Sequence, residues 1–128
     1  MSISQHLDIS VLLGKTLRAI KGGKSSDSLT FVTDSGEVYL MEHQQDCCES
    51  VTIEDIAGDL QDLIGLPLLQ AEEVSDHEPY DYDSRPDTDN TCTWTFYKLA
   101  TNKGRVTIRW YGTSNGYYSE EVSFGLVS

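Results

Sequence analysis

TCTWTFYKLATNKGRVTIRWYG, residues 91–112, contains two runs of alternating side chains with a short polar connection between them. The two runs are rich in Thr, Val, Ile and aromatic residues, which favour β-strands. The connection, Thr101-Asn102-Lys103-Gly104, has the composition of a turn. The sequence therefore predicts antiparallel strands over 91–100 and 105–112.

A third strand is predicted over 117–126, after the turn residues 113–116. In this order the three strands would form a meander, in which each strand pairs with the next. Burial of their large side chains at about 25 cal/mol per Å2 is the largest stabilising contribution that we expect. The expected core residues are Trp94, Phe96, Val106, Ile108, Trp110, Tyr118, Val122 and Phe124.

Strands are also expected over 16–21, 29–33 and 37–42, and residues 68–74 can re-enter the sheet. Asp34-Ser35-Gly36 suits a tight connection between two antiparallel strands, because Asp and Gly tolerate the backbone angles of such turns. Most of the chain is therefore predicted to be sheet.

One amphipathic helix is predicted over about 53–64. Its apolar residues recur at helical spacing, which would place them on one side of the helix: Ile53, Ile56, Ala57, Leu60, Leu63 and Ile64. Thr52 and Asp55 resemble a capping box, and Gly65 and Pro67 supply a stop signal. The solvent side would then carry the acids Glu54, Asp55, Asp59 and Asp62.

Together these elements predict an α+β fold, with a curved, mainly antiparallel sheet and one helix packed across it. A chain of 128 residues fits a single domain, 1–128. A long acidic loop is expected over about 75–90. Its aspartates do not match a calcium loop, because Arg85 stands where a ligand is expected and the characteristic glycine and glutamate are missing.

The charge is the strongest feature of the composition. There are 21 acidic residues against 9 Lys and Arg, and the net charge is -12. This disfavours direct binding to nucleic acid phosphates. An acidic surface promotes solubility, and it can also compete for the basic surface of another protein.

No apolar stretch approaches the roughly 20 residues that span a bilayer, and the amino terminus lacks the pattern of a signal peptide. We therefore expect a cytoplasmic protein without membrane association. Its three cysteines do not form an ordinary disulfide framework, which agrees with free thiols.

The densest group of reactive residues is a short run that contains His43, Asp46, Cys47, Cys48 and Glu49. As zinc ligands these residues lack the spacing of a standard site. A cysteine nucleophile with His43 as its base would be a second role, although no known catalytic signature supports it. The structural interpretation is a hydrogen-bonded turn with one buried cysteine, and we expect neither a metal nor a cofactor.

Asn115 and Tyr117 belong to a second conspicuous run, Asn115-Gly116-Tyr117-Tyr118. Asn-Gly is a strong hairpin signal, and alternation would place one tyrosine inward and the other outward. The outward tyrosine could stack on a nucleotide or on an aromatic group of a partner.

Four segments carry a family resemblance: 43–49, Glu54-Asp55-Ile56 with Gly58-Asp59-Leu60, Trp94-Thr95-Phe96-Tyr97-Lys98, and Ser114-Asn115-Gly116-Tyr117-Tyr118-Ser119. Over roughly 36–124 the chain resembles a family of small proteins of unknown function that tailed bacteriophages and prophages chiefly encode. The resemblance implies a genomic setting and no mechanism.

From these observations we expect a small acidic accessory protein that binds and modulates a host protein without catalysis. Its contacts would come from Asp55, Asp59 and Asp62 and from the acidic loop. The alternatives are a metal- or thiol-dependent enzyme centred on His43, Cys47 and Cys48, and a protein that binds a small nucleotide. Pairing of an amino-terminal edge strand with a second copy would give a homodimer.

Overall fold

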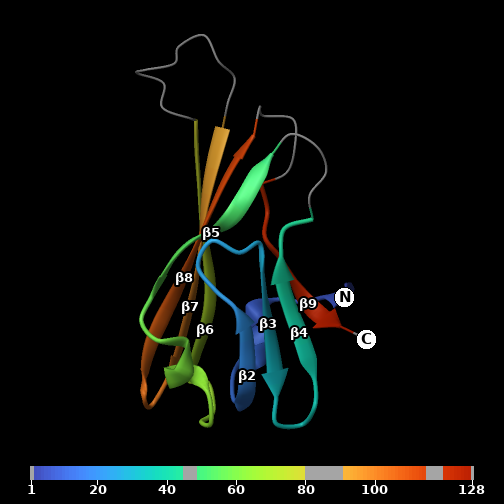
Figure 1. Cartoon of the computed structure of the whole chain (residues 1–128), viewed down its shortest axis with the longest axis vertical. Coiled ribbons are helices and arrows are strands. Elements are labelled where there is room, and N and C mark those ends of the chain that lie inside the picture. Colours follow the sequence, from blue (N-terminus) through green and yellow to red (C-terminus); the bar gives the residue numbers. More distant parts are fainter. Residues whose placement is uncertain (1, 45–48, 80–90, 115–119, 128) are drawn as a thin grey trace.

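The computed structural model describes residues 2–44, 49–79, 91–114 and 120–127, and these residues build an all-β fold. They form two antiparallel sheets, one of five strands and one of four, which lie beside each other (Figure 1). The described part of the chain contains no α-helix and only two short 3-10 helices, η1 (Ile9–Leu12) and η2 (Leu60–Leu63). None of its helices is long and apolar enough to cross a membrane.

The five-stranded sheet has the order β1-β9-β4-β3-β2. In that order its strands are Ile3–His6, Ser123–Val127, Val38–Glu42, Ser28–Thr33 and Leu17–Gly22. The four-stranded sheet has the order β5-β8-β7-β6, and its strands are Ser50–Ala57, Gly104–Ser114, Thr91–Thr101 and Gln70–Pro79.

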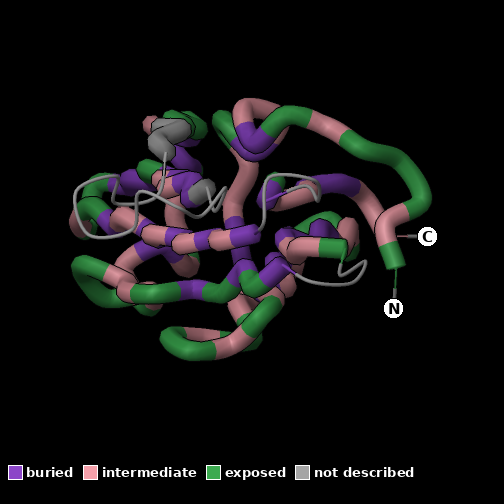
Figure 2. The backbone as a smooth tube through the Cα atoms, turned by 90° about the horizontal axis from the view of Figure 1, so that it is seen from above, coloured by how far each residue is buried: buried purple, intermediate pink, exposed green. Residues whose placement is uncertain are grey.

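The inner faces of the two sheets share one hydrophobic core. Along the strands that cross the middle of the molecule, buried residues alternate with less buried ones (Figure 2). This is the period of two that strands impose on their side chains. Both sheets and η1 contribute fully buried side chains, which include Ile9, Leu12, Phe31, Met41, Ile53, Leu99 and Trp110.

The prediction of a helix over 53–64, and with it the α+β fold class, is wrong. Residues 50–57 form strand β5, and only η2 follows. A bulge between Ile53 and Asp55 adds one residue to β5. Ile53 and Ile56 therefore face the same side of the sheet although they are three positions apart. The bulge therefore imitates the apolar spacing of a helix. Gly58, with φ of +104°, then ends the strand.

The predicted meander is also wrong. Strand β9 lies in the five-stranded sheet, where it pairs with β1 and β4 and has no pairing with β8. Trp94 and Phe96 are not core residues: Tyr97 and Leu99 occupy the inner face of β7, and the period of two turns the other set outward. On this outer face the rings of Trp94 and Tyr111 lie 4.3 Å apart.

Other strands agree with the predictions, namely β2, β3, β4, β7 and β8, while β1 was not predicted. Strand β6 continues to Pro79, so residues 75–79 of the predicted loop over 75–90 are strand. Residues 80–90 lie outside the described residues.

Candidate functional site: an acidic pocket between the sheets

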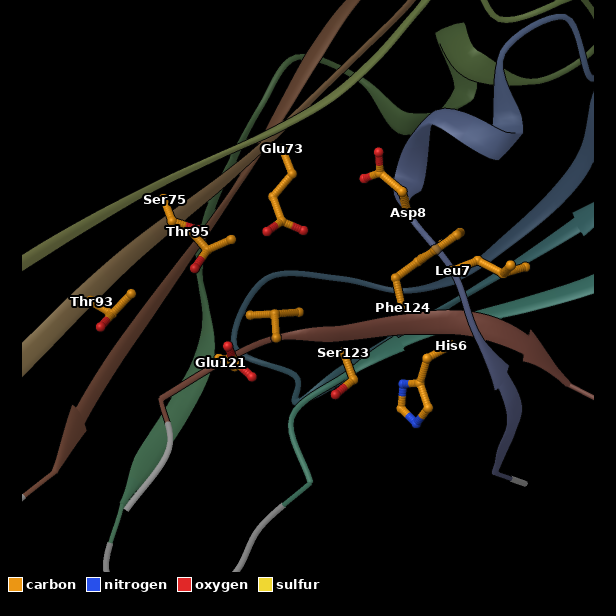
Figure 3. Close-up of a pocket in the computed structure, with 11 residues that line it drawn as sticks. His6, Leu7, Asp8, Glu73, Ser75, Thr93, Thr95, Glu121, Ser123 and Phe124 are labelled. Atoms are coloured by element: carbon orange, nitrogen blue, oxygen red, sulfur yellow. The ribbon is translucent and has the colours of Figure 1, made fainter. Parts of the chain in front are cut away.

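A pocket of about 380 Å3 lies between the two sheets. One wall is the inner face of β6 and β7, and the other comes from the chain after β1 together with residues 121–124 (Figure 3). The pocket therefore joins parts of the chain that are more than 100 residues apart in sequence.

Strand register explains the first wall. Glu73 is opposite Tyr97 and Ser75 is opposite Thr95 in the β6–β7 pair. Ala71, two residues before Glu73, faces inward and is buried in the core. Because strand side chains repeat every two residues, Glu73 and Ser75 point to the same side as Ala71. Along β6 the inward-facing side chains therefore change from apolar to polar.

The opposite wall carries Asp8 and Glu121. The backbone N–H of Leu7 donates to the carbonyl oxygen of Phe124 over 2.9 Å, which joins the two segments of this wall. The Ser10 hydroxyl donates to Asp8 Oδ2 over 2.9 Å, which fixes the carboxylate just before η1. Figure 3 shows the carboxylates of Asp8 and Glu73 pointing into the pocket from its two sides.

The charge of this lining is one-sided. Its described residues include three carboxylates, Asp8, Glu73 and Glu121, together with His6, and no lysine or arginine. Like charges that surround one cavity give a negative potential that attracts cations. No group of three or more His, Cys, Asp or Glu side chains in the described ranges is placed to hold a metal ion. The lining is therefore acidic.

Tyr97 is opposite Glu73 in the β6–β7 pair and lies beneath the surface rather than in the lining of the pocket. Its side chain is fully buried. Burial, then the charge of Glu73 and a side-chain hydrogen bond with the same residue, raise the pKa of Tyr97 far above its usual value. Asp8 and Glu121 raise the pKa further, so the hydroxyl is within the field of all three pocket carboxylates. The phenol is therefore neutral at physiological pH.

A buried hydrogen-bond network lies next to the pocket. The Thr93 hydroxyl donates to Glu120 Oε1 over 2.6 Å, and the Ser114 hydroxyl donates to Glu120 Oε2 over 2.6 Å. All three residues are buried. The network ties the chain at Glu120 to β7 and β8, and the next residue is the pocket residue Glu121.

His43 adds a second connection to the same segment. Its Nδ1 lies 2.7 Å from the carbonyl oxygen of Glu121, and its Nε2 lies 2.8 Å from Glu49 Oε2. A carbonyl oxygen only accepts hydrogen bonds, so Nδ1 carries a proton. Both ring nitrogens are engaged and the side chains of His43 and Glu49 are buried, which makes this pair a connection between strands.

The structure separates the three acids that the predicted helix would have placed together. Asp55 lies on β5 near Lys24 Nζ, at 3.8 Å, and near Arg109. Asp59 Oδ1 accepts from the backbone N–H of Gln61 over 3.0 Å and caps η2. Asp62 lies beside Gly104. These acids therefore form no common helix face.

Of the other predicted site residues, His43 and Glu49 are brought together, whereas five lie outside the described residues: Asp46, Cys47, Cys48, Asn115 and Tyr117. Sequence reasoning missed Glu73, Tyr97 and Glu120. A usable signal was Thr93, Thr95 and Tyr97 in phase on one strand, which indicates an inner face that becomes polar.

Comparison with known proteins gives a family but no function. No curated protein and no solved structure matches the chain significantly. A family model described as a domain of unknown function (DUF7448) matches residues 10–124, which is most of the chain. The protein therefore belongs to the DUF7448 family.

Proposed function

We propose that this protein is a binding protein whose pocket between the sheets receives a positively charged group of a partner protein. The observation that carries the proposal is the lining of the pocket, whose described residues include three carboxylates and no lysine or arginine. The Ser10 hydroxyl holds the Asp8 carboxylate, so this part of the negative site exists before any partner arrives. Such preorganisation favours binding, because less has to be ordered when the partner docks.

The charge of the whole chain supports the same proposal. With a net charge of -12, the protein attracts basic surfaces and accelerates their encounter with the pocket. The partner would accordingly have a basic surface, and binding alone would modulate it.

The setting of this interaction is a further part of the proposal. The resemblance to proteins that tailed bacteriophages encode favours a viral accessory protein that acts on a protein of its bacterial host, in the host cytoplasm. This part has only the resemblance in its favour, whereas the pocket supports a cationic partner from any source.

No observation of the described residues favours the two alternatives. A thiol- or metal-dependent enzyme would need His43, but both of its ring nitrogens are already hydrogen bonded. A nucleotide would bring negative phosphates to three carboxylates, which repel them.

The test is fluorescence anisotropy of a labelled basic peptide that contains lysine and arginine, titrated with three forms of the protein. Wild type should bind, and Asp8→Asn with Glu73→Gln should weaken binding about tenfold, which corresponds to about 1.4 kcal/mol. Glu72→Gln is the matched control, because it removes one charge from the opposite face of the same strand. Its effect should stay below threefold.

Two results would contradict the proposal. If wild type shows no binding at low salt, the pocket does not recognise cationic peptides. If Glu72→Gln weakens binding as much as Asp8→Asn with Glu73→Gln does, net charge attracts the peptide and the pocket has no special part in it.

A further inference from the structure

The outer face of β7 and β8 carries a second pocket, of about 270 Å3, whose charge is opposite to that of the pocket between the sheets. Its described lining contains Lys98 and Arg105 and no carboxylate. We propose that this pocket binds a phosphate group, carried either by a phosphorylated side chain of a partner protein or by a small phosphate ester. The proposal does not rest on the proposed function, because the two pockets share no residue.

The first support is the distribution of charge along the chain. Strands β7 and β8 and the turn between them, residues 91–114, contain four of the nine Lys and Arg residues and none of the 21 acidic residues. The remainder of the chain is therefore more acidic than the net charge of -12 indicates, and this segment is basic. Salt screens exposed charges beyond about 10 Å at 0.1 M, so a ligand at this surface responds mainly to the nearest charges.

The second support is that two of these four cations have no partner within the described part of the chain. Arg109 forms an ion pair with Glu54, and Lys103 Nζ donates to a backbone carbonyl oxygen over 2.8 Å. Lys98 and Arg105 are exposed and form neither an ion pair nor a side-chain hydrogen bond with any described residue. Their donors are therefore available to a ligand in the pocket.

Strand register brings these two side chains to one place. In the β7–β8 pair, Lys98 is opposite Thr107 and Ala100 is opposite Arg105. Lys98 and Arg105 are thus diagonal neighbours on the outer face, and such residues lie about 7–8 Å apart. Gln70 is opposite Ala100 in the β6–β7 pair, so a short side chain separates Gln70 from Arg105. Both cationic side chains are long enough to reach one group held between them.

The donors favour a phosphate over a carboxylate. The lining combines an ammonium, a guanidinium, the Thr107 hydroxyl and the Gln70 amide, which come from three strands. A carboxylate is planar, and a single guanidinium can satisfy both of its oxygens. A phosphate monoester has three terminal oxygens and a charge of about -1.5 to -2 at pH 7, so it can accept from several sides at once.

Two acids lie near the pocket without lining it. Glu72 is opposite Lys98 in the β6–β7 pair, but its Oε1 accepts from Gln70 Nε2 over 3.1 Å. Asp62 lies beside Gly104. Neither acid forms an ion pair with the two cations of the pocket. Because Glu72 is a negative charge close to the site, its removal should strengthen the binding of a phosphate.

The experiment is a two-dimensional NMR titration of isotopically labelled wild type and of two double variants with the same change of charge. Lys98→Gln with Arg105→Gln removes the two cations of the pocket. Arg18→Gln with Lys21→Gln is the matched control, because it removes one exposed arginine and one exposed lysine from β2 in the other sheet. The probes are glycerol 3-phosphate and two peptides of one sequence, with phosphoserine or serine at the central position.

Wild type should show saturable shifts of the backbone amide signals over residues 98–107, and the serine peptide should cause none. The pocket variant should weaken phosphate binding about tenfold through the loss of charge-assisted hydrogen bonds. The control variant should weaken it less than about twofold, and Glu72→Gln should strengthen it about twofold. All substituted side chains are exposed, so the melting temperature should change little and a folded protein is compared in every case.

The outcomes decide both the site and the source of the phosphate. Equal weakening by the two double variants would overturn the proposal, because net charge would then explain the binding. Equal binding of the two peptides, or no shifts with any probe, would also overturn it and leave the acidic pocket unaffected. Tighter binding of the phosphoserine peptide supports the site and identifies a partner protein as the source, whereas tighter binding of glycerol 3-phosphate supports the site and identifies a small ester.

Discussion

Glu120 shows how a single buried residue positions the pocket. Each of its two carboxylate oxygens accepts a hydrogen bond from a hydroxyl, one from Thr93 on β7 and the other from Ser114 at the end of β8. The residue also lies against Gly112, where a Cβ atom would come within 3.1 Å of Glu120 Cβ. The small glycine therefore lets the chain before β9 approach the four-stranded sheet, and the carboxylate holds it there.

We predict that Glu120→Ala lowers the free energy of unfolding by about 2–3 kcal/mol, because two buried hydroxyls lose a charged acceptor. Urea denaturation followed by tryptophan fluorescence measures this change. The exposed Glu72→Ala serves as the control and should change stability by less than about 0.5 kcal/mol. Equal stability of the two variants would mean that the network does not hold this segment.

At the scale of elements, the end of β5 determines the path of the backbone over residues 50–65. The bulge after Ile53 keeps both Ile53 and Ile56 against β8, and Gly58 then takes a positive φ. A Cβ atom at this position would collide with the carbonyl oxygen of Arg105. A side chain there would therefore strain the backbone and also push β8 away.

We predict that Gly58→Ala destabilises the fold by about 2–3 kcal/mol, from a positive φ combined with the contact to Arg105. Gly23→Ala is the matched control, since nothing lies within 4 Å of its Cβ position. That control should leave stability unchanged within about 0.5 kcal/mol. Thermal unfolding of both variants distinguishes a required glycine from a general effect of added methyl groups.

At the scale of the whole molecule, the acidic residues repel one another. A net charge of -12 destabilises any compact state, and salt screens this repulsion over a Debye length of about 10 Å at 0.1 M. The exposed ion pair between Lys15 and Glu37, at 3.0 Å, loses strength under the same conditions. Exposed pairs contribute little, so the effect of the net charge should dominate.

We therefore predict that an increase from about 50 to 500 mM NaCl raises the melting temperature by a few degrees. Differential scanning calorimetry at constant pH measures it. Potassium chloride should act like sodium chloride, because screening depends on ionic strength. A fall in melting temperature would show that attractive ion pairs outweigh the repulsion between acids.

The sequence alone identified the strands whose pattern is local. Strands β3 and β4 are joined by a segment with the composition of a tight turn, and β7 and β8, each with alternating side chains, are joined by a second turn. In both cases strands that are neighbours in sequence pair with each other. The alternating pattern of side chains gave wrong predictions in β5 and β7. In β5 the bulge produced helical spacing. In β7 the inner face carries Thr93, Thr95, Tyr97 and Leu99, whereas the large apolar side chains of Trp94 and Phe96 lie on the outer face.

The sequence by itself thus determined the sheet-rich character, the hairpins and the negative charge, because these depend on neighbouring residues and on composition. Tertiary structure alone decided that β9 joins β4 and β1, and that Asp8, Glu73 and Glu121 surround one pocket. The physical reason is that pairing between distant strands depends on the free energy of the whole packed core. No short window of sequence contains that information.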